Sequence, residues 1–111
     1  MAFQNIVAAK LGQGAIPATT FNYYICPANT QTYVKDIDIC NTGSSSINVT
    51  VYIVPNGSTA STSNALFYSA ALASHNTLQW TGTQIMVAGD SIQAVASATG
   101  CTIVISGGQA V

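Results

Sequence analysis

In the middle of the chain, branched apolar side chains recur at every second position. Ile47, Val49, Val51 and Ile53 are each separated by one polar or aromatic residue. Because successive side chains of a β-strand point to opposite faces, this spacing places all four on the same face, against a core. A Pro-Asn-Gly sequence follows at residues 55–57, and these residues are typical of a tight turn. The segment therefore predicts a half-buried strand.

Strand patterns of this kind recur along the chain, whereas helix signals are nearly absent. The sequence contains no glutamate and no arginine, which are strong helix formers. Short strands separated by turn residues predict an all-β, single-domain β-sandwich or jelly roll of about eight strands. Besides 47–53, the predicted strands cover residues 4–11, 19–26, 32–41, 65–73, 77–81, 84–87, 91–98 and 101–106. Residues 65–73 would also suit a short helix, but about nine residues are marginal for one.

The length of 111 residues is that of one domain. We expect residues 1–14 to form an N-terminal strand or arm, because an apolar stretch ending at Leu11 precedes a predicted turn at Gly12-Gln13-Gly14. Residues 15–111 then form the β-sandwich domain. The predicted core positions alternate within their strands and are Ile37, Ile39, Ile47, Val49, Val51, Ile53, Leu78, Trp80, Ile92, Ala94, Ile103 and Ile105.

Charged residues are unusually scarce, at 5% of the chain against about 25% in a typical domain. Neutral polar side chains instead make the surface wettable, since 39 of the 111 residues are Ser, Thr, Asn or Gln. With Lys10 and Lys35 as the only lysines and no arginine, the chain can neutralise few phosphates, which argues against nucleic-acid binding. Low charge also removes the repulsion that keeps monomers apart, so we expect self-association.

The sequence offers no membrane signal. Its apolar stretches are much shorter than the span of about 20 residues that crosses a bilayer. The first residues lack the basic start and long apolar stretch of a secretory leader. We therefore expect neither a transmembrane protein nor a membrane partner.

The three cysteines, Cys26, Cys40 and Cys101, do not have the spacing of a metal knuckle or of a dense disulfide framework. An odd number leaves at least one thiol free. Apolar neighbours in strand-like segments favour small buried core residues. A disulfide between Cys26 and Cys40 across two adjacent strands is the alternative.

Residues that could carry catalysis or hold a metal are few. His75 is the only histidine and lies in a Ser-His-Asn turn, so a hydrolase triad would have to use it. Asp36 and Asp38 are two apart on one strand and point the same way, not across a cleft as paired catalytic carboxylates would. A solvated strand face beside Lys35 is the favoured interpretation, and a shared calcium ion is the alternative. Asp90 follows Gly89 in a turn. The sequence therefore predicts no enzyme, no catalytic residues, no cofactor and no metal site.

The aromatic residues form a separate group of candidates. Tyr23 and Tyr24 are adjacent in one predicted strand and should point to opposite faces, so that at least one leaves the core. Core packing or a protein interface is the favoured role for the group, and a sugar-stacking platform is the alternative. Its members are Phe21, Tyr23, Tyr24, Tyr33, Phe67, Tyr68 and Trp80.

Three stretches resemble small structural proteins of tailed-bacteriophage virions. Residues 24–42 contain a Pro-Ala-Asn-Thr lead into a strand that ends in Cys-Asn-Thr. Residues 49–57 carry the central strand with its Pro-Asn-Gly turn, and residues 86–92 carry an Ala-Gly-Asp-Ser-Ile turn. The resemblance covers roughly residues 21–106 and consists of turns and strands.

The resemblance implies a capsid decoration, or cement, protein on the outer surface of a virion assembled in the bacterial host cytoplasm. Such a protein forms homotrimers that bind the major capsid protein and stabilise the head. The alternative is a head-to-tail, tail or head-fibre component, with host-glycan binding through exposed tyrosines. Many modest contacts would add up to strong docking. The proposed partner contacts are Phe3, Ile6, Val7, Tyr23 and Tyr24.

Overall fold

The structure is a computed structural model that describes residues 6–110. These residues form eight β-strands and one short 3-10 helix, Thr62–Asn64. The strands are β1 (Ile6–Ile16), β2 (Phe21–Ile25), β3 (Gln31–Asn41), β4 (Ile47–Val54), β5 (Ala65–Leu72), β6 (Thr77–Met86), β7 (Ser91–Ala96) and β8 (Cys101–Ala110). The predicted all-β class is confirmed.

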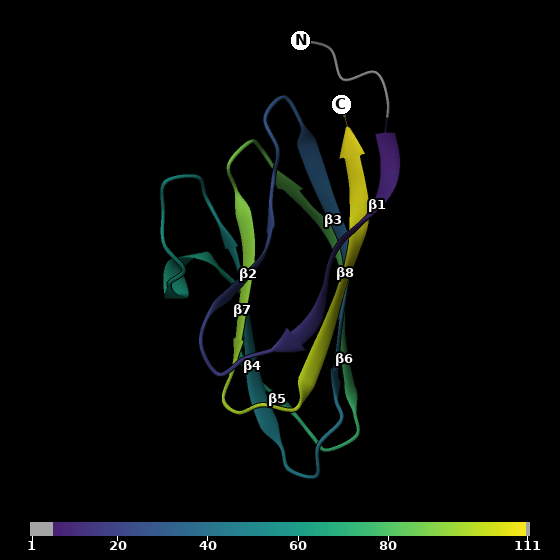
Figure 1. Cartoon of the computed structure of the whole chain (residues 1–111), viewed down its shortest axis with the longest axis vertical. Helices are drawn as coiled ribbons and strands as arrows, with labels where there is room; N and C mark the ends of the chain where they lie inside the picture. Colours follow the sequence, from purple (N-terminus) through teal and green to yellow (C-terminus); the bar gives the residue numbers. More distant parts are fainter. Residues whose placement is uncertain (1–5, 111) are drawn as a thin grey trace.

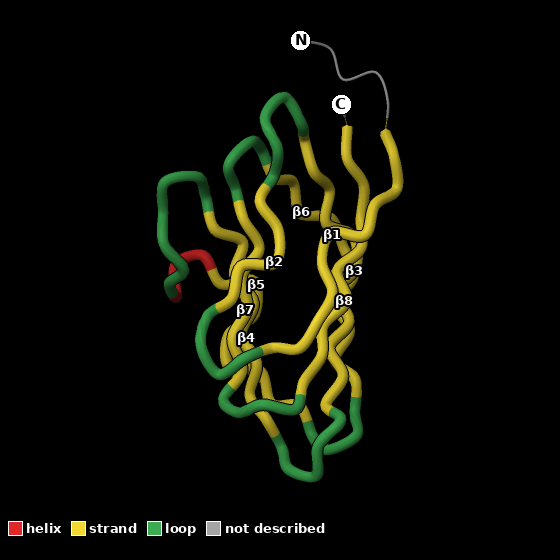
Figure 2. Tube along the Cα trace, in the orientation of Figure 1, coloured by secondary structure: helices red, strands yellow, loops and turns green. Residues whose placement is uncertain are grey.

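The strands make two antiparallel sheets that face one another (Figure 1). One sheet has the order β1-β8-β3-β6 and the other has the order β2-β7-β4-β5. Consecutive strands therefore pass repeatedly between the sheets, and the first and last strands lie side by side, which is the strand order of a jelly roll. Figure 2 shows most of the loops at the two ends of the sandwich, and the short 3-10 helix on the outer side of the β2-β7-β4-β5 sheet. Within the described residues, no helix could span a bilayer.

The core lies between the sheets and is filled by branched aliphatic side chains. Nine of the twelve predicted core residues are buried, because the alternation places them on the inner face of each strand. Ile53, Leu78 and Trp80 are only partly buried and pack against the edge of the core. Several buried residues were not predicted, among them Ile16, Val34 and Met86.

The predicted turn at Gly12-Gln13-Gly14 is wrong. These residues lie inside β1, which continues to Ile16 and pairs with β8 along its whole length. The register shifts between Lys10 and Gly12, so an irregularity in the strand takes the place of a turn. A side chain at Gly12 would make a tight contact, because its Cβ would lie 3.0 Å from the Cβ of Tyr23.

The predicted division of residues 77–87 into two strands also differs from the structure. Residues 77–86 form one strand, β6, because Gly82 and Thr83 form an irregularity opposite the register shift of β3, and Val87 lies beyond its end. Residues 65–73 do form a strand, β5, as predicted.

One buried polar side chain connects the two sheets and a loop. The Asn41 side chain is fully buried at the end of β3. Its amide nitrogen donates to the carbonyl oxygens of Ser45 and Leu72, at 2.8 and 3.0 Å, and its oxygen accepts from the Gly43 N–H at 2.9 Å. A single amide therefore fixes a loop and joins β3 in one sheet to the end of β5 in the other.

Candidate interaction surface

One end of the β1-β8-β3-β6 sheet has an apolar outer face. Ala8, Gly108, Tyr33 and Ile85 are direct neighbours in the register of the four strands, so they form one row across the sheet. The inner-face neighbours of this row, such as Val34 and Met86, are buried, which places the row on the outside. We call this row, together with Ile6, the apolar row.

A shallow groove of about 530 Å³ lies along the apolar row, and every member of the row except Ile85 lines it. Room for the groove is left by Gly108, which occupies the outward position between Ala8 and Tyr33 and has no side chain there. Ile6 at one wall is 72% exposed and Ile85 at the other side of the row is 56% exposed, so large apolar side chains face solvent here. The groove is lined by Ile6, Ala8, Tyr33, Lys35, Thr83, Gly107 and Gly108.

The polar groups at the border of the groove are few. The Lys35 ammonium donates to the Thr83 hydroxyl at 2.7 Å. The Tyr33 hydroxyl donates to the Gln31 side-chain oxygen at 2.9 Å. An apolar centre with a polar rim is also found in protein–protein interfaces.

The predicted partner contacts at the N-terminus fall partly on this surface. Phe3 lies outside the described residues. Ile6 forms a wall of the groove. Val7 is 56% exposed and pairs with Gln109, whose side chain points between the sheets, so Val7 lies at the sheet edge on the opposite side from the groove.

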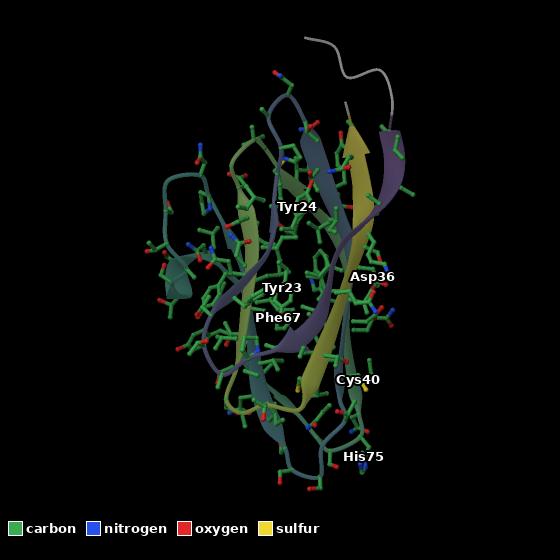
Figure 3. All side chains as sticks on the ribbon, viewed as in Figure 1. Tyr23, Tyr24, Asp36, Cys40, Phe67 and His75 are labelled. Atoms are coloured by element: carbon green, nitrogen blue, oxygen red, sulfur yellow. The ribbon has the colours of Figure 1, made fainter. Side chains whose placement is uncertain are left out.

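Tyr23 and Tyr24 do not take opposite faces of β2. The register shifts between Asn22 and Tyr24, so both side chains point toward the β1-β8-β3-β6 sheet (Figure 3). The Tyr23 hydroxyl donates to the Ala15 carbonyl at 2.6 Å, and burial raises the pKa of this phenol. The Tyr24 hydroxyl lies 2.7 Å from the Thr32 hydroxyl and accepts from the Gln109 amide at 2.6 Å. Both tyrosines pack partly buried against the core and connect the sheets.

An acidic pair lies further along the same outer face. Asp36 and Asp38 occupy outward positions of β3, alternating with the buried Ile37 and Ile39. Desolvation raises the pKa of Asp38, and a hydrogen bond to Asp36 and the charge of Asp36 raise it further. The Gln79 amide lies 3.5 Å from an Asp36 oxygen. Among the described residues, no group of three or more His, Cys, Asp or Glu side chains is placed to hold a metal ion.

The other candidates for catalysis lie apart from each other. His75 is an exposed turn residue with φ of 60°, and its Nδ1 lies 3.3 Å from the Ser74 hydroxyl. The Asp90 carboxylate accepts from the backbone N–H groups of Asn56 and Val87, at 2.9 and 3.0 Å, and so joins two turns. Figure 3 shows His75 and Asp36 well separated. The described residues bring no nucleophile, base and acid together.

All three cysteines are free, so the alternative of a Cys26–Cys40 disulfide is wrong. Cys26 and Cys101 are buried, as predicted, whereas Cys40 is only partly buried on β3. Burial raises the pKa of the Cys101 thiol, and the nearby Cys40 raises it further. Cys101 is therefore a packing residue that stays protonated at neutral pH.

Most residues of the groove were not predicted as contacts from the sequence. Ala8, Tyr33, Ile85 and the glycine pair come from four different strands, and only the register brings them into one row. The Gly107-Gly108 pair was a signal, because two glycines inside a strand mark a place without side chains. The predicted strand instead ended at residue 106.

Comparison with family models finds no match, and comparison with curated proteins finds none either. Among solved structures, the chain is similar to a chain of the Bacillus endospore appendages, which are described as disulfide-linked pili, with a TM-score of 0.54 and 15% identity over 99% of this chain and 93% of the other. It is also similar to a chain of the infectious bursal disease virus particle, with a TM-score of 0.54 and 10% identity. A chain of the Gx strain of that virus gives a TM-score of 0.50 and 11% identity.

The alignments with the pilus protein and with the viral proteins cover very different shares of those chains. The alignment covers 96% of this chain in both viral comparisons but only 30% and 32% of the viral chains, so this chain corresponds to about a third of their length. At these identities the likeness concerns the fold alone. The chain shares its fold with proteins of a bacterial pilus and of a viral particle.

Proposed function

We propose that this chain is a non-catalytic structural subunit that docks through the apolar row of its β1-β8-β3-β6 sheet. The observation that carries the proposal is the groove lined by Ile6, Ala8 and Tyr33, where large apolar side chains are exposed on a chain with few charges. Exposed apolar surface of this kind marks interaction sites in soluble proteins. The neighbours in the pilus and the virus particle support a role in assemblies.

The specific role that we propose is a capsid decoration protein of a tailed bacteriophage. The resemblance in residues 21–106 supports this role, and the jelly-roll order of the strands is compatible with it. The partner would be the major capsid protein, and self-association into homotrimers would multiply the contacts. The site of action would be the outer surface of the virion, after assembly in the bacterial host cytoplasm.

The five predicted contact residues would contribute to docking in different ways. Ile6 would contact the partner directly, and Phe3 would extend the contact along a strand or arm over residues 1–14. Val7 would reach the partner only at the exposed edge of β1, since it lies on the opposite side from the groove. For Tyr23 and Tyr24 we propose an indirect contribution, because their hydroxyls bond to the sheet that carries the groove. They would keep the docking sheet in place.

A second candidate function is a self-assembling fibre subunit, such as a head fibre or tail component. The observation that favours it is the likeness to the pilus protein, which spans both chains almost from end to end. A chain of this size would then build a fibre without a larger shell protein.

Co-sedimentation with phage heads tests the proposal. Purified protein is mixed with heads of the phage that encodes it, prepared without this protein, and bound protein is measured across a concentration series. Ile6→Lys places a charge in the groove wall, and we expect at least about tenfold weaker binding. Ile25→Lys is the matched control, because Ile25 is 59% exposed on β2 in the other sheet.

The outcomes separate the two candidates. Saturable binding of wild type and Ile25→Lys, with weak binding of Ile6→Lys, supports the decoration role. Failure of wild type to bind heads rejects that role. Regular fibres of the purified protein in electron micrographs would then support the second candidate.

A further inference from the structure

We propose that the outer face of the β2-β7-β4-β5 sheet carries a binding site for a neutral saccharide. This inference goes beyond the structural role and concerns the opposite sheet from the apolar row. The site is a hollow of about 240 Å³ in which β4, β5 and β7 meet. It is lined by Asn48, Thr50, Tyr52, Tyr68, Ser69, Val95, Ala96 and Ser97.

The hollow exists because β5 leaves its regular pairing with β4. The register between these strands shifts between Val49 and Val51, opposite residues 68 and 69. Ser69 has φ of 50°, a left-handed conformation that is uncommon for a residue other than glycine. Its backbone N–H donates to the Thr50 hydroxyl at 2.8 Å. Such strained backbone persists where the surroundings hold it, and it gathers at ligand sites.

The aromatic wall of the hollow is Tyr68. Its side chain is 60% exposed, although the residue lies within a strand whose neighbours Phe67 and Ala70 pack against the core. An exposed tyrosine ring presents an apolar face, on which the C–H face of a sugar ring can pack, and a hydroxyl at its edge. Val95, opposite Thr50 in the register, adds an apolar patch to the floor.

The polar atoms of the hollow have spare hydrogen-bonding capacity. Among the described residues, the side chains of Asn48, Ser69, Tyr52 and Tyr68 make no hydrogen bond in the structure. The Ser97 hydroxyl accepts from the Asn48 backbone N–H at 3.0 Å and keeps its own proton to donate. One amide and several hydroxyls beside an aromatic ring match the alternating hydroxyls and C–H groups of a sugar.

The absence of charge selects the class of saccharide. All the lining residues are neutral, so a phosphate, sulfate or carboxylate on the ligand would find no cationic partner. The hollow is also smaller than the roughly 300–1,000 Å³ of pockets for drug-sized ligands. It therefore suits one ring of a neutral glycan, with the rest of the chain outside.

Titration with defined polysaccharides tests the site. Dextran, mannan and galactan are titrated into the folded protein by calorimetry and by saturation-transfer NMR, with polygalacturonate as the anionic comparison. We expect at least one neutral polymer to bind with a Kd of about 1 mM or tighter. Tyr68→Ala and Asn48→Ala should each weaken this binding about tenfold. Phe21→Ala is the matched control, because Phe21 is an exposed aromatic residue outside the hollow.

The results separate this site from the docking surface. Equal thermal stability of the variants shows that the fold is kept, and unchanged binding of Tyr68→Ala to phage heads shows that the docking sheet is independent. The proposal is overturned if none of the three neutral polymers binds, if Phe21→Ala weakens binding as much as Tyr68→Ala, or if polygalacturonate binds as tightly as the neutral polymers.

Discussion

Asn41 connects three backbone groups through one buried amide. Its partners are the N–H of Gly43 and the carbonyls of Ser45 and Leu72, and the side chain is fully shielded from water. In Asn41→Leu these groups would remain buried without a partner, so we expect a loss of about 3 kcal/mol in the free energy of unfolding. Chemical denaturation measures this value.

The matched control for Asn41→Leu is Asn22→Leu. The Asn22 side chain is exposed and accepts one hydrogen bond, from the Tyr24 N–H at 3.2 Å. Its replacement should cost less than about 1 kcal/mol. Equal losses in both variants would show that the buried amide has no special part in stability.

Asp38 gives the fold a predictable response to pH. Its pKa in the folded chain is raised, so folding favours the protonated carboxyl. This contribution is fully present below the ordinary pKa of aspartate and is lost as pH rises through the raised pKa. At pH 7, Asp38→Asn should therefore raise Tm slightly, by about 2 °C, and the gain should disappear near pH 3.

Thermal melts at both pH values check the Asp38 prediction. Asp90→Asn is a useful contrast, because both Asp90 oxygens accept backbone hydrogen bonds and an amide can replace only one of them. It should lower Tm at pH 7. A lower Tm for Asp38→Asn at pH 7 would mean that the acidic pair stabilises the fold.

At the scale of strands, the close pairing of β3 and β8 depends on a glycine. A Cβ at Gly107 would overlap the carbonyl oxygen of Tyr33, which is backbone and cannot turn away. We expect Gly107→Ala to destabilise the chain by about 3 kcal/mol and to distort the apolar groove. Denaturation curves report the first effect, and loss of head binding reports the second.

Gly43→Ala is the control for this substitution. The nearest atom to its added Cβ would be the Asn41 side-chain oxygen at 3.4 Å, and its φ is outside the left-handed region. The change should cost less than about 1 kcal/mol. If Gly107→Ala were tolerated equally well, β8 would not need to approach β3 so closely.

The strands that could be predicted are those whose side chains alternate strictly. The inner face of β4 and the paired isoleucines of β3 and β8 were identified because burial on one face requires a period of two. Irregularities were not predicted. The shift in β1 at Lys10 and the shift in β2 at Tyr23 depend on contacts with distant strands, so glycines inside β1 resembled a turn and two tyrosines seemed to alternate.

The candidate surfaces were predictable only in part, for the same reason. Ile6 was identified from its place in an apolar N-terminal stretch, and Tyr68 belonged to the aromatic group considered for sugar stacking. The other members of each surface are far apart in the sequence. Only the order of strands in each sheet brings Tyr33 beside Gly108, or Asn48 beside Tyr68.

As a whole, the molecule is an elongated sandwich whose two sheets offer different outer faces. Its principal extents are 49, 26 and 19 Å, and its formal net charge is −1. One sheet presents the apolar row and the other presents the neutral polar hollow. Since long-range charge contributes little, association should depend on contact area, with little sensitivity to salt.

Sedimentation velocity of the wild-type protein at low and high salt measures this dependence directly. If the apolar row drives association, the protein should form discrete oligomers as its concentration rises from about 1 µM to 1 mM, equally at roughly 0.05 and 1 M NaCl. A protein that stays monomeric over this range, or whose oligomers dissociate at high salt, would contradict assembly through apolar contact.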